Sequence, residues 1–147
     1  MDDALSTIHT ASEEETMAAG LALAGHLSGV VLLEGELGAG KTTLVRGIVS
    51  GIEGANSEEV SSPTFTLIHD YGAGVFHIDL YRLEGEREIE ALGLDEIFEN
   101  GRLILVEWGS KLGMLTPECY TTIQIESKDQ QERVLHIKEN SRDSASH

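Results

Sequence analysis

Eight consecutive residues match a pattern that binds phosphate. Residues 35–42, Gly-Glu-Leu-Gly-Ala-Gly-Lys-Thr, fit G-x-x-x-x-G-K-[ST] at every fixed position. Glycines let the N–H groups of such a loop turn inward around a phosphate, and the following helix presents the positive end of its dipole to the anion. Lys41 is expected to meet the β- and γ-phosphates from a solvated loop outside the core, and Thr42 to offer its hydroxyl to Mg²⁺. The pattern therefore predicts a nucleoside triphosphate as ligand.

The residues on either side of this octet supply the structural context that it requires. Val30-Val31-Leu32-Leu33 predicts a strand buried on both faces, and residues 43–49 place apolar side chains at helical spacing. With Gly near its average usage of about 7%, a chance match is expected in fewer than about one chain of this length in a hundred. A strand, a glycine-rich loop and a helix in this order favour a phosphate-binding loop over an accidental turn.

The other segments predict an α/β protein with a mixed sheet. The last two strands alternate in hydrophobicity, which is typical of half-exposed antiparallel strands around a polar turn. Residues 70–74 are expected to form a hairpin turn, and the helical stretch 86–100 to break near Gly93. Further strands are expected at residues 5–10, 65–69, 75–80, 103–106, 121–126 and 133–138, and a first helix from Ser12 to about Leu27. Glu13, Glu14 and Glu15 are expected to serve the dipole of that helix.

Length and composition limit the classes of protein to consider. A chain of 147 residues predicts one domain, here residues 1–139, with a disordered tail from Asn140. Twenty-six acidic and ten basic residues give a net charge of −16 with histidines neutral. Because this field repels polyanions, tight independent binding of nucleic acid is not expected, and proteins with basic surfaces are the expected partners.

The remaining features favour a cytoplasmic protein. Cys119 is the only cysteine, so no intrachain disulfide is expected and a structural role is favoured. The acidic start Met1-Asp2-Asp3 does not resemble a signal peptide. The weakly polar run from Met17 to Leu27 is shorter than the roughly 20 residues that a membrane helix needs. We therefore expect no membrane association.

Two carboxylates directly follow predicted strands and are candidates to act near the γ-phosphate. Asp79 follows Val75-Phe76-His77-Ile78, and Glu107 follows Leu103-Ile104-Leu105-Val106. Ligands of open α/β sheets bind beyond the carboxyl ends of the strands. An acid at a strand end is often only solvated, but a phosphate-binding loop needs a second acidic group near its metal. His77 lies within an apolar strand and is expected to be an interior histidine with its hydrogen bonds satisfied, not a ligand.

Other phosphate-binding classes make demands that the chain meets poorly. A Ras-like GTPase carries Asn-Lys-x-Asp, and the nearest fragment, Ser127-Lys128-Asp129, does not fit, so adenine is favoured. A small-molecule kinase needs clustered arginines to clamp the transferring group. The chain has scattered ones: Arg46, Arg82, Arg87 and Arg102. Spatial clustering keeps the kinase open as an alternative, together with a nucleotide-gated adaptor that barely hydrolyses ATP.

Four motifs together resemble one family. GELGAGKTT at 35–43, SPT at 62–64, HIDLYRL at 77–83 and VEW at 106–108 occur in the order and approximate spacing of the TsaE (YjeE) family. That family comprises small bacterial ATPases required for threonylcarbamoyladenosine (t6A) modification of tRNA. The resemblance extends from about residue 5 to residue 138.

The resemblance implies a three-layer P-loop NTPase sandwich, with a central mixed sheet and antiparallel C-terminal strands. It implies binding of ATP and Mg²⁺, slow hydrolysis, and action on the proteins TsaD and TsaB. Thr42 and Glu107 look like the metal site, and Asp79 like the acid of a Walker B strand or the group that orients water. The division of roles between Asp79 and Glu107 stays open. Thr64, in the switch-like Ser-Pro-Thr loop, is a candidate sensor of the γ-phosphate, although an ordinary turn also explains it.

Three further groups complete the expected site. Trp108 is either a core or rim aromatic or a contact to partner or nucleotide. Arg133 is a candidate nucleotide contact, with an exposed strand charge as the alternative. The expected catalytic residues are Lys41, Asp79 and Glu107. The expected nucleotide-binding residues are Glu36, Leu37, Gly38, Ala39, Gly40, Lys41, Thr42, Thr43, Thr64, Trp108 and Arg133.

Overall fold

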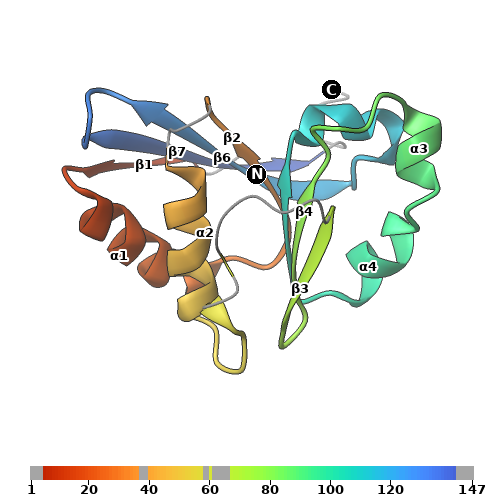
Figure 1. Cartoon of the computed structure of the whole chain (residues 1–147), viewed down its shortest axis with the longest axis horizontal. Coiled ribbons are helices and arrows are strands. Elements are labelled where there is room, and N and C mark those ends of the chain that lie inside the picture. The colour runs from red at the N-terminus through yellow and green to blue at the C-terminus, as the bar shows by residue number, and fades with distance from the viewer. Residues whose placement is uncertain (1–4, 37–39, 58–59, 61–66, 142–147) are drawn as a thin grey trace.

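A computed structural model describes residues 5–36, 40–57, 60 and 67–141. The predictions for Leu37, Gly38, Ala39 and Thr64 fall outside these described residues. Within them the chain forms a seven-stranded mixed sheet with helices on both faces (Figure 1). The strands are β1 (Leu5–Thr10), β2 (Gly29–Glu34), β3 (Ile68–Gly72), β4 (Val75–Asp79), β5 (Leu103–Glu107), β6 (Cys119–Ser127) and β7 (Arg133–Ser141). The helices are α1 (Glu13–Leu23), α2 (Lys41–Ser50), α3 (Glu86–Glu90) and α4 (Leu94–Asn100), with 3₁₀ segments η1 (Ala24–His26) and η3 (Gly109–Leu115).

The sheet is parallel at its centre and antiparallel towards its edges. Its strand order is β1-β7-β6-β2-β5-β4-β3. Strand β2 pairs in parallel with both β5 and β6, and β4 pairs in parallel with β5. The β1–β7, β6–β7 and β3–β4 pairs are antiparallel. The last two strands are therefore antiparallel to each other, as predicted, whereas β6 is parallel to its other neighbour.

Two apolar cores lie on opposite faces of this sheet. Successive side chains of a strand point to opposite faces, so the buried strands β2 and β5 supply both cores. The α1/α2 core contains Val31, Leu33, Leu103 and Leu105 together with Leu44 and Ile48 of α2. The α3/α4 core contains Val30, Leu32, Ile104 and Val106 together with Ile89, Leu94 and Leu112. Figure 1 shows α1 and α2 side by side on one face, and α3 and α4 on the other.

Within the described residues the element predictions hold, with changes at their ends. Residues 65 and 66 of the strand expected at 65–69 lie outside the described part, and β3 begins at Ile68. Helix α1 ends at Leu23 and is followed by the 3₁₀ turn η1. The prediction of a single helix up to about Leu27 was therefore wrong. Two helices separate at Gly93, whose φ of 72° suits glycine, as predicted. The β3–β4 hairpin is also confirmed, but its turn is shorter than residues 70–74 because β3 continues to Gly72.

The last two strands are longer than predicted. Tyr120 pairs with Asn140 and Cys119 with Ser141, so β7 continues beyond Lys138 and includes the first two residues of the expected tail, which was wrong there. The rest of that tail, residues 142–147, falls outside the described residues. None of the helices that the structure describes combines the length and apolar character needed to cross a bilayer.

Helices α1 and α2 pack closely because glycines remove side chains from their contact. A Cβ added to Gly20 of α1 would lie 2.6 Å from the carbonyl oxygen of Leu44. A Cβ added to Gly47 of α2 would overlap the backbone of Met17. Both distances are too short for a larger residue without moving a helix. The two glycines therefore allow the backbones of α1 and α2 to approach each other closely.

Candidate functional site

The phosphate-binding loop leads into α2 at Gly40 and Lys41. Gly40 has a φ of 104°, a left-handed conformation that glycine adopts without steric cost. Its carbonyl oxygen accepts the first helical hydrogen bond, from Leu44, at 3.0 Å. Lys41 is the first residue of α2, so the amino end of the helix opens where a phosphate is expected.

A cavity of about 690 Å³ lies in front of this helix end. Thr42, Lys41 and Glu107 all line it, so the cavity joins the expected lysine with both expected metal ligands. Its full lining comprises Glu13, Glu14, Thr16, Gly40, Lys41, Thr42, Thr43, Glu107, Gln130, Gln131 and Arg133. Of the expected site residues that the structure describes, Glu36, Asp79 and Trp108 do not line it.

The sequence analysis missed one wall of this cavity. Glu13 and Glu14, expected only to serve the helix dipole, line it from the first turn of α1. The hydroxyl of Thr43 donates to Glu13 Oε1 at 3.2 Å and connects α1 to α2. Gln130 and Gln131 contribute from the β6–β7 turn. No local pattern marks these residues, because chain topology alone brings them together.

Lys41 is held by two oxygens inside the protein. Its ammonium donates to the carbonyl oxygen of Gly35 at 2.8 Å and lies 3.6 Å from Glu107 Oε1. Only 9% of the side chain is exposed, so the expected solvated loop position was wrong. Burial of a charged group costs free energy unless it is paired, and these two oxygens provide the pairing.

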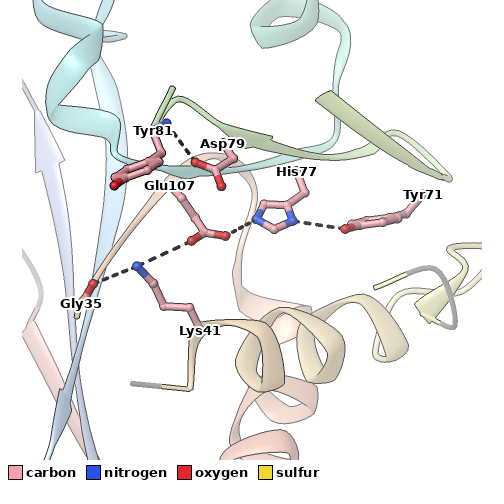
Figure 2. Close-up of polar contacts among 7 residues, drawn as sticks. All are labelled: Gly35, Lys41, Tyr71, His77, Asp79, Tyr81 and Glu107. Carbon is pink, nitrogen blue, oxygen red and sulfur yellow. Dashed lines mark hydrogen bonds and ion pairs between the residues drawn. The ribbon is translucent and has the colours of Figure 1, made fainter. Parts of the chain in front are cut away.

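Glu107 lies at the centre of a row of polar contacts, which Figure 2 shows. Its Oε2 accepts a hydrogen bond from His77 Nε2 at 2.7 Å, and His77 Nδ1 lies 3.1 Å from the hydroxyl of Tyr71. Burial raises the pKa of Glu107, but the hydrogen bond and charge of His77, followed by those of Lys41, outweigh this and leave the pKa below its usual value. Glu107 is therefore a carboxylate at neutral pH. His77 is satisfied on both ring nitrogens, as the sequence predicted.

Asp79 lies beside Glu107 but faces a different partner. The two residues are directly paired in the parallel register of β4 and β5. Asp79 Oδ1 accepts a hydrogen bond from the backbone N–H of Tyr81 at 3.0 Å, in the bend after β4 (Figure 2). The structure thus brings both strand-end acids to one edge of the sheet and places only Glu107 in the cavity wall.

Trp108 is a rim aromatic. Its side chain is 40% exposed, and the centre of its ring lies 6.0 Å from Lys41 Nζ and 5.0 Å from the ring of Tyr81. Its φ is 63°, a left-handed conformation that costs a non-glycine residue roughly 1–2 kcal/mol. The strand-to-3₁₀ transition after Glu107 therefore turns the indole outwards beside the lysine.

Arg133 connects the β6–β7 turn with the phosphate-binding loop. Its guanidinium donates to the carbonyl oxygens of Asp129, Gln130 and Glu132 at 2.9, 3.3 and 3.0 Å. Its Nε would lie 3.5 Å from a Cβ built on Gly40. Arg133 thus stabilises the turn and lines the cavity. It is therefore not simply an exposed charge on a strand, which was the alternative prediction.

The donor set fits Mg²⁺ when a nucleotide supplies further oxygens. Mg²⁺ takes oxygen ligands, commonly one or two from the protein, with phosphates and water completing the set. The Thr42 hydroxyl and the Glu107 carboxylate offer oxygens of this kind, and both line the cavity. Within the described residues no group of three or more His, Cys, Asp or Glu side chains could hold a metal ion.

Comparisons with known proteins agree on one family. Residues 10–135 match the family model of TsaE, the threonylcarbamoyl adenosine biosynthesis protein. The chain is 43% identical over 131 residues to the tRNA threonylcarbamoyladenosine biosynthesis protein TsaE of Bacillus subtilis, an alignment that covers 86% of this chain and 80% of the relative. It is 40% identical over 103 residues to the protein of that name from Haemophilus influenzae, covering 68% of this chain and 64% of the relative. The crystal structure of Bacillus subtilis YdiB superposes with a TM-score of 0.73 at 28% identity, covering 99% of this chain and 93% of that one.

The lowered pKa of Glu107 predicts a specific dependence of stability on acid. A carboxyl group whose pKa is lower in the folded state stabilises the fold above its unfolded pKa, near 4.5, and this contribution disappears as pH falls through the folded pKa. We expect the unfolding free energy of the unaltered protein to fall more steeply below pH 5 than that of Glu107→Gln. Urea denaturation from pH 3 to pH 8 measures both curves. The control is Glu53→Gln, which removes an exposed carboxylate. Parallel curves for the unaltered protein and Glu107→Gln would contradict the expectation.

Proposed function

The chain belongs to the TsaE family of threonylcarbamoyl adenosine biosynthesis proteins, and from this premise we propose that it binds ATP with Mg²⁺ and hydrolyses it slowly. In this proposal it acts in the cytoplasm, on the proteins TsaD and TsaB of the t6A-forming machinery. We further assign the mixed sheet with helices on both faces to the three-layer P-loop NTPase sandwich. The observation that carries the proposal is the meeting of Lys41, Thr42 and Glu107 in one cavity at the amino end of α2.

The volume and chemistry of the cavity suit a nucleotide. A cavity of about 690 Å³ falls within the range of roughly 300–1,000 Å³ that is typical of small-molecule sites. Lys41 and the helix end attract phosphates at one end. Gln130 and Gln131 offer hydrogen-bonding amides on the β6–β7 side. The cavity therefore offers a cation and a helix end for phosphates, and amide groups elsewhere in its lining.

Each residue of the site has a distinct part in hydrolysis. Lys41 exchanges the Gly35 carbonyl for phosphate oxygens and stabilises the negative charge that grows on them. Thr42 and Glu107 would hold Mg²⁺, which would neutralise charge on the phosphates. Asp79, at the same edge of the sheet, orients the attacking water. Of these two acids Glu107 lines the cavity and Asp79 does not, which supports the assignment of the metal to Glu107.

The kinase alternative receives less support. Arg46 donates through Nε and Nη2 to the carbonyl oxygen of Val60, at 3.1 and 2.7 Å, so it holds a loop. Arg82, Arg87 and Arg102 are exposed and do not line the cavity. Among the described arginines only Arg133 reaches it. A kinase that clamps a transferring phosphoryl group needs several arginines at its site.

Removing the ammonium of Lys41 tests the phosphate site. We expect Lys41→Ala to lower the rate of ATP hydrolysis by about 10²-fold or more, because one stabilising donor is commonly worth that much. Since Lys41 is buried against Glu107, a moderate loss of thermal stability is also expected. Phosphate release and circular dichroism measure the two effects. The matched control is Lys138→Ala, on exposed β7 surface. A folded Lys41→Ala protein that hydrolyses ATP at the unaltered rate would refute the assignment.

Isosteric changes at the two acids test their roles. Glu107→Gln keeps the side-chain shape but removes the charge that Mg²⁺ favours, so we expect a higher Mg²⁺ midpoint as well as lost hydrolysis. Asp79→Asn is expected to lose hydrolysis at an unchanged Mg²⁺ midpoint. Calorimetric titration of each variant with ATP at increasing Mg²⁺ concentrations gives both midpoints without requiring hydrolysis. An unchanged midpoint for Glu107→Gln, with a raised one for Asp79→Asn, would exchange the two roles.

The charge of the chain predicts how it meets its partners. At −16 it offers few cations to replace phosphate counterions, so we expect weak binding to free tRNA at physiological salt. We expect tighter binding to a TsaD–TsaB preparation with ATP than with ADP, because a nucleotide shifts an association only through different affinities for the two states. Calorimetric titration with each nucleotide, and separately with tRNA, measures these affinities. Tight binding of tRNA alone would contradict the first expectation, and equal affinity with ATP and ADP the second.

A further inference from the structure

A row of polar side chains crosses three adjacent strands on the α1/α2 face of the sheet. Tyr71 of β3, His77 of β4 and Glu107 of β5 are joined by contacts of 3.1 and 2.7 Å (Figure 2). Glu107 then meets Lys41 of α2. The row thus begins in the α1/α2 core and ends at the residue that starts the phosphate-binding helix.

The side chains of this row are fixed by burial. Tyr71 is 5% exposed and belongs to the α1/α2 core. The side chains of His77 and Glu107 are 13% and 14% exposed. The rings of Tyr71 and His77 also lie 6.2 Å apart, in packing contact. A partly exposed histidine without these neighbours would sample several rotamers, whereas this one has its ring held from both sides.

The two carboxylate oxygens of Glu107 contact different partners, and only one of these contacts is expected to persist when a nucleotide binds. Oε1 faces Lys41, which the proposed function assigns to the phosphates when a nucleotide binds. Oε2 accepts the hydrogen bond from His77, which lies on the sheet and has no part in phosphate binding. When Lys41 turns to the phosphates, the contact with His77 therefore remains to hold the carboxylate.

We propose that His77, held in turn by Tyr71, is a positioning residue that directs the Glu107 carboxylate towards the metal of the bound nucleotide. The inference rests on the proposed function in one respect, the assignment of Mg²⁺ to Glu107. Carboxylates that bind metals are commonly oriented by hydrogen bonds of their own, and losing such a partner typically costs 10–100-fold in metal affinity. His77 acts through Glu107 and does not touch the nucleotide.

Tyr71 suits this role because its hydroxyl can serve either form of the histidine. A hydroxyl donates to an unprotonated ring nitrogen and accepts from a protonated one. The contact with Nδ1 therefore persists in both forms, and Nε2 keeps its proton directed at Glu107. The ring of Tyr71, buried in the core, fixes the position of that hydroxyl.

Two amide substitutions at position 77 test whether the hydrogen bond to Glu107 is needed or whether any polar side chain at this position is sufficient. The amide nitrogen of a glutamine is as many bonds from Cα as His Nε2, so His77→Gln can still donate to Glu107. The amide nitrogen of an asparagine corresponds to Nδ1, so His77→Asn can face Tyr71 but falls short of Glu107. Tyr71→Phe removes only the hydroxyl and keeps the ring in the core. Tyr120→Phe, a half-buried tyrosine beside the α3/α4 core, is its matched control.

The affinity for Mn²⁺, used in place of Mg²⁺, measures the effect without hydrolysis. Electron paramagnetic resonance follows free Mn²⁺ during titration of the full chain saturated with ADP, and calorimetry without metal gives the ADP affinity. We expect His77→Asn to weaken Mn²⁺ binding roughly 10-fold, Tyr71→Phe a few-fold, and His77→Gln and Tyr120→Phe little. The metal-free ADP affinity is expected to stay unchanged in all four.

Other results would contradict either the positioning role of His77 or the proposed metal site itself. Equal Mn²⁺ affinity in the unaltered protein, His77→Asn and Tyr71→Phe would refute the positioning role alone. Equal weakening by His77→Gln and His77→Asn would show that His77 only supports the fold, which thermal unfolding of both variants would register. If the unaltered protein with ADP binds no Mn²⁺, the proposed metal site itself fails and the inference falls with it.

Discussion

The candidate site depends on a buried contact between Lys41 and Glu107. Taking either charge out of water alone costs several kcal/mol, so each needs the other, together with Gly35 and His77, to be tolerated where it lies. This contact joins the first turn of α2 to the end of β5. The lysine consequently lies beside the carboxylate that is assigned to the metal. The phosphates of one bound ligand can replace the contacts of Lys41 with Gly35 and Glu107 together.

The sheet makes this contact possible by sorting side chains between two faces. Along β5, Ile104 and Val106 enter the α3/α4 core, whereas Leu103 and Leu105 enter the α1/α2 core. Glu107 continues the second series and therefore points to the side of α2. Because β4 is parallel to β5 and in register with it, His77 and Asp79 fall on the same face as Glu107. The polar row is thus an extension of the pattern that builds the core.

Local sequence patterns were sufficient to predict part of this arrangement. The phosphate-binding octet predicted Gly40 and Lys41 at the helix start, and apolar runs followed by acids predicted Asp79 and Glu107 at one edge of the sheet. Burial of Lys41 could not be predicted, because it arises from a carbonyl and a carboxylate that topology brings to it. The cavity wall formed by α1 and the β6–β7 turn joins segments more than 110 residues apart, for which the chain carries no periodic signal. The outward turn of Trp108 depends on a left-handed residue that sequence propensity disfavours.

The charges around the cavity set limits on how it can hold a polyanion. Glu13, Glu14 and Glu107 line it together with two basic side chains, Lys41 and Arg133, and the guanidinium of Arg133 already binds three carbonyls. A triphosphate brought into this surrounding meets carboxylates as well as cations, in a chain whose overall field is negative. Attraction must therefore come from short-range features: the lysine, the N–H groups at the start of α2, and a divalent cation that offsets charge on both phosphates and Glu107. Such a site is expected to discriminate strongly between nucleotide with metal and nucleotide without it, and if His77 orients Glu107 as proposed, this discrimination also depends on His77.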